Sequence, residues 1–515
     1  MRWFGEVARL GFAGSVAVAV ALATGELLAG LLSGVPSPLL AVAQFIIDVQ
    51  PPGAKELAVA LFGTADKIAF QVLIVVVALV IGALLGRLAD RRPTPAAAVI
   101  MAFVAAGFLA SLRDASASLT LAAAAAGIEA VVGISVLRRL VDLARAPASA
   151  DGRSGMPDWR RRSLLQAGGA LAIGSFIAGA AGRYLLEGQR TPVAAGAPPT
   201  APRPAELPAG ADIATTDLTA AGLTPIVVPN DDFYRIDTAL VVPNVDRDQW
   251  TLRVSGLVGR EVILTFDQLV ALPVIEQYVT IACVSNEVGG DLVGNARWTG
   301  VALRDVLEMA GVQPVADQLV GRSVDGFTAG MPVEWVMDES RVPMIAVAMN
   351  GEPLPRAHGY PARLIVPGLY GYVSATKWLS DLELTRFDQF EGFWVPRGWA
   401  VRAPVLTQSR IDVPRQGNRF PAGRVAIAGV AWAPDRGIEA VEVRIDDGPW
   451  QRATLSSPIS KATWIQWLYA WDATPGSHRI EVRSTDGTGE VQTDAQSAPA
   501  PDGARGHHSI QVTVT

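Results

Sequence analysis

The residue of this chain with the most distinctive chemistry is its single cysteine, Cys283. Because the chain has no second thiol, this cysteine cannot form an intrachain disulfide, and a zinc or iron–sulfur site made of several thiolates is excluded. A lone thiolate can attack a substrate as a nucleophile, or it can give one soft sulfur ligand to a metal that other groups also hold. Free cysteine is also often a small buried apolar residue, so the cysteine alone leaves three interpretations open.

Three separate segments, in the same order, resemble the sulfite oxidase family. The molybdenum-ligand segment of that family is similar to Thr280-Ile281-Ala282-Cys283 with Asn286, followed by Ala296-Arg297-Trp298-Thr299-Gly300-Val301. Its pterin-binding stretch is similar to residues 358–368, beginning His358-Gly359-Tyr360-Pro361-Ala362-Arg363, and continuing to Lys377-Trp378. A shorter third block is Phe233-Tyr234-Arg235. The resemblance covers residues 225–515.

The resemblance implies a Mo-molybdopterin cofactor, in which one cysteine thiolate binds the metal and the pterin supplies the other sulfur ligands. Cys283 is then the metal ligand. The residues implied to hold the cofactor are Phe233, Tyr234, Arg235, Asp325, His358, Arg363, Ser374 and Lys377. The residues implied at the substrate are Arg235, Trp298 and Phe390. Considered one at a time, the arginine and lysine residues could instead form surface ion pairs. Asp325 could equally be an ordinary aspartate of a turn, and Trp298 a tryptophan of the hydrophobic core.

Three segments depart from sulfite oxidases proper. Asn286 is followed by Glu287 rather than by an arginine, and Phe390 stands where those enzymes carry a tyrosine. Ile236-Asp237 replaces an Asn-His pair. The predicted site is therefore less positive and lacks a hydroxyl donor. We expect a small dianion to bind poorly there and a neutral substrate to bind better.

The predicted function is oxygen-atom transfer on a small-molecule substrate by a molybdenum-dependent oxidoreductase. The alternatives are a sulfite dehydrogenase proper, a cofactor-less binding or scaffold module on the same fold, and a thiol hydrolase with His358 as its base. None of the four histidines lies in an apolar span, and the chain has no Cys-x-x-Cys-His haem motif. We therefore expect a separate electron partner, either a cytochrome or a quinone-linked carrier.

An α+β domain and an all-β domain are expected to position these residues. Strand and helix patterns alternate irregularly over 250–258, 266–271, 279–283 and 303–310. Strands alone follow, over 424–433, 440–446, 463–471, 478–484 and 509–515. This second pattern predicts an immunoglobulin-like sandwich, and the resemblance implies that it forms a homodimer.

The N-terminal part of the chain predicts a membrane bundle. Apolar runs long enough to cross a bilayer occur at 10–32, 69–88, 94–112, 117–137 and 164–182, with a shorter run at 38–48. The arginines between the spans favour a cytoplasmic N-terminus, so the chain after about residue 185 is expected outside the cytoplasm. Glu26 and Glu129 are intramembrane carboxylates without a partner that the sequence reveals.

Arg160-Arg161-Arg162-Ser163-Leu164-Leu165 resembles a twin-arginine export signal, although a plain cytoplasmic cluster of positive charge gives the same topology. The predicted location is the cell membrane, with several spans and an extracytoplasmic catalytic domain. The fifth span is expected to remain as an anchor. A net charge of −6 argues against a nucleic-acid partner.

These patterns predict five regions along the chain. They are a four-span membrane bundle over 1–145, a basic twin-arginine-like loop with the fifth span over 146–185, a solvated Pro/Ala-rich linker over 186–225, a molybdopterin-binding oxidoreductase domain over 226–400 and an Ig-like domain over 401–515.

Overall fold

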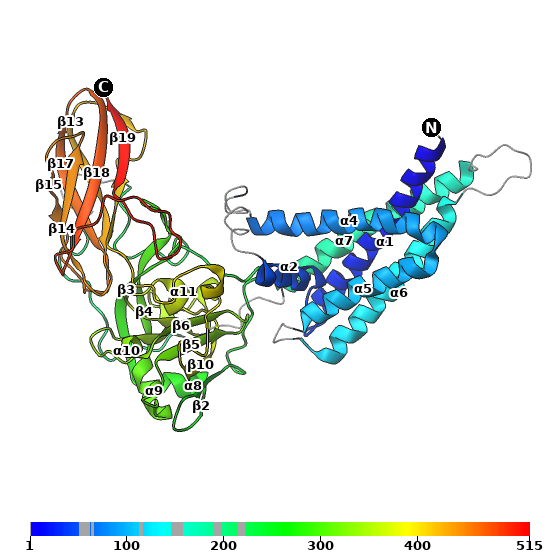
Figure 1. The fold of residues 1–515 in the computed structure, drawn as a ribbon, viewed down its shortest axis with the longest axis horizontal. Helices are drawn as coiled ribbons and strands as arrows, with labels where there is room; N and C mark the ends of the chain where they lie inside the picture. The colour runs from blue at the N-terminus through cyan, green and yellow to red at the C-terminus, as the bar shows by residue number, and fades with distance from the viewer. Residues whose placement is uncertain are drawn as a thin grey trace, which may run out of the picture. The chain divides into compact units, whose positions relative to one another are not determined.

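The structure, a computed structural model, describes residues 2–50, 62, 66–112, 117–145, 158–188, 197–213 and 222–515. The chain forms two compact units (Figure 1). One unit holds Met1–Pro192 with Thr238–Val242, and the other holds Val193–Asp237 with Pro243–Thr515. Residues 146–157 of the predicted basic loop, and residues 189–196 and 214–221 of the predicted linker, lie outside the described residues.

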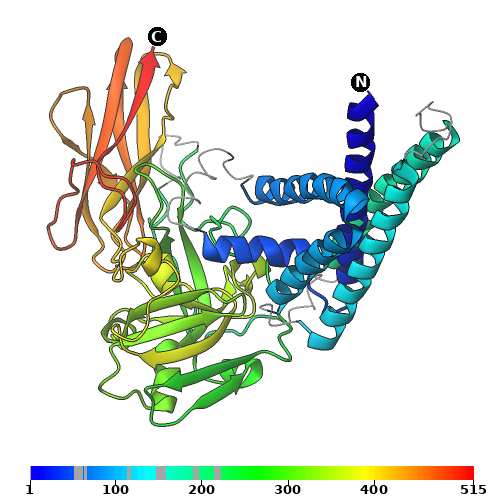
Figure 2. The ribbon, with the colours of Figure 1, turned by 45° about the vertical axis from the view of Figure 1, so that its right-hand side comes forward.

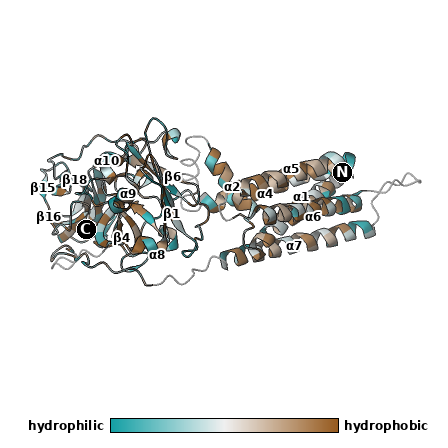
Figure 3. Cartoon of the chain, turned by 90° about the horizontal axis from the view of Figure 1, so that it is seen from below, coloured by the Kyte–Doolittle hydropathy of each residue, from teal (hydrophilic) through white to brown (hydrophobic). Residues whose placement is uncertain are grey.

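The first unit is a bundle of apolar helices, coloured mostly brown in Figure 3. Its helices are α1 (Arg2–Leu31), α2 (Pro38–Val49), α4 (Asp66–Arg91), α5 (Pro93–Ser111), α6 (Leu119–Ala144) and α7 (Asp158–Gly188). Five of them are long and apolar enough to cross a membrane, and these five match the predicted spans. The 12-residue α2 is too short to cross a bilayer, as its sequence predicted.

Glycines let the bundle helices approach closely. An added Cβ on Gly14 of α1 would overlap the backbone of Gly82 and Gly86 of α4. An added Cβ on Gly30 of α1 would overlap Gly182 of α7 in the same way. Small residues at helix contacts are the usual means of association in membranes, where apolar burial alone does not favour it.

The two carboxylates predicted to lie within the membrane differ in their surroundings. Glu26 accepts hydrogen bonds from the Ser37 hydroxyl at 2.6 Å and the Leu39 amide at 3.2 Å, and the Arg183 guanidinium lies 3.9 Å away. The sequence did not reveal these partners, because they lie 11 or more residues away from Glu26 and only the fold brings them to it. Glu129 receives no hydrogen bond from the residues that the structure describes and borders a cavity of about 20 Å³, the size of one water molecule.

Two sheets form the α+β part of the second unit. The first has strand order β2 (Val262–Thr265), β1 (Thr251–Gly256), β10 (Leu379–Thr385), β5 (Gln318–Ser323) and β6 (Thr328–Pro332). The second has strand order β3 (Val274–Ala282), β4 (Val293–Ala302), β7 (Met344–Met349) and β8 (Glu352–Pro353), with β9 (Arg363–Ile365) also on β7. Only β1 and β10 pair in parallel among these described strands.

Short helices connect these strands, and they confirm the irregular alternation that the sequence predicted. They are α8 (Phe266–Val270), α9 (Leu303–Ala310), α10 (Val333–Val336), η2 (Arg356–His358), α11 (Gly371–Ser374) and η3 (Val395–Arg397). Helix α8 begins with a capping box, in which Thr265 and Gln268 bond each other's backbone amides. Helix α9 is amphipathic and buries Leu303, Val306 and Leu307.

Residues 408–514 form two facing sheets (Figures 1 and 2). One has the order β11 (Gln408–Val413), β13 (Gly423–Trp432), β17 (Ile465–Ala473) and β16 (Thr454–Leu455). The other has the order β12 (Arg419–Phe420), β19 (His508–Val514), β18 (Gly476–Asp486), β14 (Ile438–Ile445) and β15 (Gln451–Arg452). Ile427 and Trp467 from the first sheet share a core with Val441 and Val482 from the second. The five long strands that the sequence predicted are all present.

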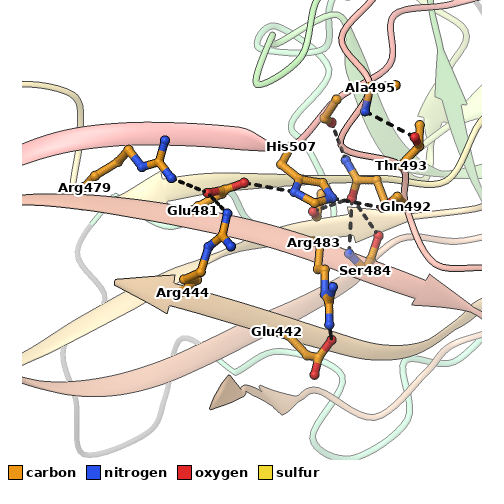
Figure 4. Close-up of polar contacts among 12 residues, drawn as sticks. Glu442, Arg444, Arg479, Glu481, Arg483, Ser484, Gln492, Thr493, Ala495 and His507 are labelled. Carbon is orange, nitrogen blue, oxygen red and sulfur yellow. Dashed lines mark hydrogen bonds and ion pairs between the residues drawn. The ribbon is translucent and has the colours of Figure 1, made fainter. Parts of the chain in front are cut away.

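Ion pairs connect the neighbouring strands β14 and β18 in the second sheet of this sandwich (Figure 4). The Glu481 carboxylate pairs with Arg444 at 2.7 Å and Arg479 at 3.1 Å, and lies 2.9 Å from Nδ1 of His507. The second ring nitrogen of His507 contacts the Gln492 carbonyl at 2.9 Å. Both ring nitrogens of His507 therefore have polar partners within the protein. The described residues contain no group of three or more His, Cys, Asp or Glu that could hold a metal.

Most side chains of residues 197–213 in the predicted linker are exposed, but a few are buried. Ala211 and Ile213 are buried, and Ile213 joins Leu468 of β17 in a small apolar cluster. The Ile213 amide donates to the Gln466 side chain at 2.8 Å. The Pro/Ala-rich stretch is thus exposed over most of its described length, and Ile213 is the point at which it packs against β17.

Candidate functional site

Cys283 stands directly after β3, where the chain turns back toward β4. Its amide donates to the Leu292 carbonyl at 2.9 Å, and its side chain is buried. The Asn286 side chain closes the turn by accepting from the Leu292 amide at 2.8 Å. We call residues 283–292 the cysteine loop. The Cys283 Sγ atom lies 2.9 Å from the Ser285 hydroxyl oxygen, within hydrogen-bond distance.

A group of rings brings the three resembling blocks together. The Phe233 ring stacks on Tyr234 with centroids 5.3 Å apart, and it meets the edges of Trp298 at 5.8 Å and His358 at 5.6 Å. Gly294 of β4 makes room for it, since an added Cβ there would lie 2.7 Å from the Phe233 ring. Residues far apart in the sequence are thus fixed by one aromatic contact.

His358, in η2, is neutral near pH 7. Burial lowers the pKa of its imidazole to about 4, and the nearby Arg363 lowers it further. Its Nε2 atom lies 2.9 Å from the Asn230 carbonyl, so this nitrogen carries the proton and donates. The Nδ1 atom is then a hydrogen-bond acceptor.

Arg363, in β9, is a buried cation that pairs with no carboxylate among the described residues. Its guanidinium donates to the carbonyls of His358 at 3.1 Å and Ala375 at 3.4 Å. Its Nε atom and the neighbouring Thr376 hydroxyl are buried without a hydrogen-bond partner in the described structure. Burial lowers the pKa of Arg363 to about 10. A buried cation whose hydrogen-bond donors lack acceptors destabilises the folded state unless an anion binds to it.

Lys377 is a second buried cation close to Arg363. Its Nζ atom lies 3.1 Å from the Asp237 carboxylate and 3.1 Å from the Ala357 carbonyl. Burial lowers the pKa of Lys377 to about 8, and Asp237 opposes this effect. Gly359 has a φ of +113°, and an added Cβ there would lie 3.0 Å from Lys377 and 3.1 Å from Arg363. This glycine lets η2 pack against both cations.

Asp325 and Arg235 lie near this pair of cations. Asp325 accepts from the Phe327 amide at 3.2 Å, as a turn aspartate does, and burial raises the pKa of its carboxyl. Arg235 pairs with Asp237 at 2.9 Å and has a side chain that is 41% exposed. Arg235, Lys377 and Arg363 therefore form a positive region that includes Asp237.

Three predicted site residues have structural contacts of their own. The Ser374 hydroxyl donates to the carbonyls of Leu369 and Tyr370, each at 3.0 Å, so it supports the turn of α11. Trp298 is fully buried beneath the Arg363 guanidinium, 5.0 Å from its ring centre. Phe390 packs against Arg322 of β5, and its predicted place at the substrate stays a prediction.

Sequence reasoning missed Ser285 and Tyr370. Burial raises the pKa of Tyr370 to about 12, and the nearby Cys283 also raises it. The Leu406 amide donates to the Tyr370 hydroxyl at 3.4 Å. Both residues lie within the segments that resemble the family. Ser285 is close in sequence to Cys283, and Tyr370 is close to Ser374, and this closeness could have marked them as site residues. Asp237 was named only as a departure from the family pattern, and its contacts with Arg235 and Lys377 were missed.

The sandwich supports the cysteine loop. Arg410 of β11 is buried, and its guanidinium donates to the Gly290 carbonyl at 2.8 Å and the Thr224 hydroxyl at 2.9 Å. The His508 ring lies against Gly289, where an added Cβ would overlap it. The cysteine loop is therefore held in place by residues of the sandwich.

These residues fit the cofactor that the resemblance implies. Molybdopterin carries a phosphate, and buried Arg363 and Lys377 are suited to bind an anion. The spare Arg363 Nε and Thr376 hydroxyl are hydrogen-bond donors without a protein acceptor among the described residues. Cys283 offers a soft sulfur ligand within the same group of side chains, as its effect on the pKa of Tyr234 and Tyr370 indicates.

Comparison with known proteins agrees with this fit. Residues 239–394 match the oxidoreductase molybdopterin binding domain. The mitochondrial sulfite oxidase of Homo sapiens is 30% identical over 315 residues, a match that covers 52% of this chain and 57% of that protein. The chain thus spans little more than half the length of that relative.

Two further proteins are similar. The uncharacterized oxidoreductase YuiH of Bacillus subtilis (strain 168) is 35% identical over 157 residues, which cover 30% of this chain and 75% of that protein. The crystal structure of the sulfane dehydrogenase SoxCD from Paracoccus pantotrophus has the same fold, with a TM-score of 0.50 and 23% identity over 56% of this chain and 82% of that one. By its matching domain and these relatives, the chain belongs to the sulfite oxidase family of molybdopterin-binding oxidoreductases.

Proposed function

We propose that the chain is a membrane-anchored, extracytoplasmic molybdopterin-dependent oxidoreductase that moves an oxygen atom to or from a small substrate. The observation that carries the proposal is the buried Arg363, which has spare donors and no carboxylate partner among the described residues. It lies in one group of side chains with the only thiol of the chain. An anionic cofactor with a thiolate-bound metal satisfies both groups at once.

The roles of the residues follow from their surroundings. Cys283 would hold the metal, and Arg363, Lys377 and the Thr376 hydroxyl would hold the anionic part of the cofactor. Neutral His358 would accept a hydrogen bond at Nδ1, and Asp325, Phe233 and Tyr234 would line the pterin. Ser374 would act indirectly, through the turn of α11. When bound, the molybdenum centre supplies a two-electron exchange coupled to oxygen-atom transfer.

We propose that the substrate binds beside the exposed part of Arg235 and that Phe390 is an apolar neighbour of the bound substrate. Trp298 would support the site because its ring packs against the Arg363 guanidinium and holds it in place. The Glu287 side chain is exposed, so its charge would act at the entrance rather than inside. These features favour a small neutral substrate over sulfite.

The remaining parts of the chain would place and connect this site. The five apolar helices support membrane anchoring, and the arginine pattern supports an extracytoplasmic catalytic domain. We propose that the chain divides into five separate parts, over 1–145, 146–185, 186–225, 226–400 and 401–515. The terminal sandwich would be an Ig-like dimerisation domain. A separate cytochrome or quinone-linked carrier would exchange the electrons.

Metal analysis and activity assays test this function together. Full-length protein from a molybdenum-competent host should contain about one molybdenum per chain and should reduce a sulfoxide with an artificial electron donor. Molybdenum without turnover of sulfoxide but with rapid turnover of sulfite would identify a sulfite dehydrogenase. Protein without molybdenum would contradict the proposal and favour a binding or scaffold module.

Membrane coupling needs a second assay. Protein that lacks residues 1–145 should keep its activity with an artificial carrier but lose electron exchange with native membranes. Unchanged exchange with membranes would contradict the role of the bundle.

A further inference from the structure

One oxygen of the Asp237 carboxylate contacts two cations of the site. Oδ2 lies 2.9 Å from Arg235 Nε and 3.1 Å from Lys377 Nζ. The Asp237 side chain is 4% exposed and the Lys377 side chain is 11% exposed. The ion pair between Asp237 and Lys377 is therefore screened weakly by salt, and its charges act strongly on nearby groups. The Arg235 side chain is 41% exposed and so is open to a ligand from solvent.

A surface pair with the same spacing shows what is unusual here. Arg386 and Asp388 are also two residues apart and lie 2.8 Å from each other, but their side chains are 45% and 56% exposed. Such an exposed pair contributes little to stability or to binding. Asp237 differs because it is buried and because it also reaches Lys377, which lies 140 residues away in the sequence.

Asp237 changes the charge that an incoming ligand meets. The positive region contains Arg235, Lys377 and Arg363, and His358 is neutral because burial lowers its pKa. Without Asp237, an anion near the exposed part of Arg235 would be attracted by cations with little opposing charge. With Asp237, two of the three cations already have a carboxylate partner.

The effect depends on the charge of the ligand. A dianionic oxyanion would be repelled by the Asp237 carboxylate and would have to compete with it for Arg235. A neutral S-oxide would still accept a hydrogen bond from the guanidinium and would meet no repulsion. A buried carboxylate in this position therefore discriminates by charge rather than by size.

We propose that Asp237 is a specificity-determining residue that disfavours dianionic oxyanions at Arg235 and so selects a neutral oxygen donor or acceptor. This inference rests on the proposed function, because it assigns the substrate class of that same site. It gives the carboxylate a role that differs from binding the cofactor.

Sulfate binding tests the inference without turnover. Sulfate is an inert tetrahedral dianion, and its affinity for molybdenum-loaded, full-length protein in detergent can be measured by isothermal titration calorimetry at low salt. We expect Asp237→Asn and Asp237→His to bind sulfate at least about tenfold more tightly than the unaltered protein, a change of about 1.4 kcal/mol. Asp237→Glu should bind it as weakly as the unaltered protein does. The matched surface variant Asp388→Asn should change nothing.

A second readout is the ratio of kcat/KM for sulfite to kcat/KM for dimethyl sulfoxide. This ratio should rise in Asp237→Asn, mainly through a lower KM for sulfite. If the unaltered protein holds molybdenum but turns over neither compound, the proposed function fails, while the sulfate comparison still tests Asp237.

Two results would overturn the inference. The first is a molybdenum-loaded Asp237→Asn or Asp237→His protein that binds sulfate no more tightly than the unaltered protein. The second is a loss of molybdenum in both variants, because the carboxylate would then serve the cofactor rather than the substrate.

Discussion

Burial keeps two histidines of the second unit neutral at physiological pH. Burial lowers the pKa of both His358 and His508 to about 4, and a nearby arginine adds to the effect in each case. An imidazole in an unfolded chain titrates near 6.5. Between these two values the unfolded chain binds more protons than the folded protein.

The free energy of unfolding should therefore fall as the pH falls from 6.5 to 4. Replacing His508 by Gln, which keeps an acceptor for the Ile411 amide, should make this fall shallower. The measurement is thermal unfolding followed by tryptophan fluorescence over this pH range. All tryptophans except Trp3 and Trp159 lie in the second unit, so the signal reports on it.

His478 offers a control of opposite sign. Its hydrogen bond to Asp446 raises its pKa, so its contribution to stability is present at low pH and is lost as the pH rises. His478→Gln should therefore leave the slope between pH 6.5 and 4 unchanged, and should lessen the loss of stability as the pH rises above 6.5. Parallel curves for the unaltered protein and His508→Gln would contradict the assignment.

At the scale of elements, strand β11 holds the loop that carries the thiol. Arg410 bonds the Gly290 carbonyl and the Thr224 hydroxyl, and it pairs with Asp412 at 2.7 Å. Hydrogen bonds from a charged donor contribute about 1.5–3 kcal/mol each. The cysteine loop should open more often when they are removed.

Because Cys283 is the only cysteine, a thiol reagent reports on this loop alone. We expect Arg410→Ala to speed alkylation of Cys283 in metal-free protein by at least about tenfold, which corresponds to roughly 1.4 kcal/mol of easier opening. Arg415→Ala, a nearby exposed arginine, is the control and should leave the rate unchanged. Equal rates for Arg410→Ala and the unaltered protein would show that β11 does not hold the loop.

Local patterns were enough to predict most elements. Alternation predicted β13, β14, β17, β18 and β19, and long apolar runs predicted α1, α4, α5, α6 and α7. Motif resemblance also brought Phe233, His358 and Arg363 into one predicted site, and the structure places them together.

Contacts between distant residues could not be predicted in the same way. Asp237 meets Lys377 across 140 residues, and Arg410 meets Gly290 across 120. No local period or spacing encodes such pairs, because only the folded backbone brings them together. The contact of Ile213, within the predicted linker, was missed for the same reason, since its partner Gln466 lies 253 residues away.

At the scale of the whole molecule, we propose that the start of α7 determines how the second unit crosses the membrane. Arg161 and Arg162 are exposed at the start of this helix, whereas Leu164 is buried. An exposed pair is accessible to an export receptor, and a plain cluster of charge would act through its charge alone. The two explanations differ in what they require of the side chains.

Changing both Arg161 and Arg162 to Lys keeps the positive charge and should still prevent export of the second unit. The measurement is protease digestion of intact spheroplasts, in which the unaltered second unit is degraded and the variant unit is protected. Arg138→Lys with Arg139→Lys is the matched control and should not affect export. Unchanged digestion of the Arg161/Arg162 variant would favour a simple charge signal.

The central claim is that Cys283 binds molybdenum, and X-ray absorption at the molybdenum K-edge tests it most directly. Molybdenum-loaded Cys283→Ser should show one sulfur ligand fewer than the unaltered protein, with an oxygen in its place. Ser285→Ala, which removes the neighbouring hydroxyl, should keep the full sulfur shell. An identical sulfur count in the unaltered protein and Cys283→Ser would contradict the account.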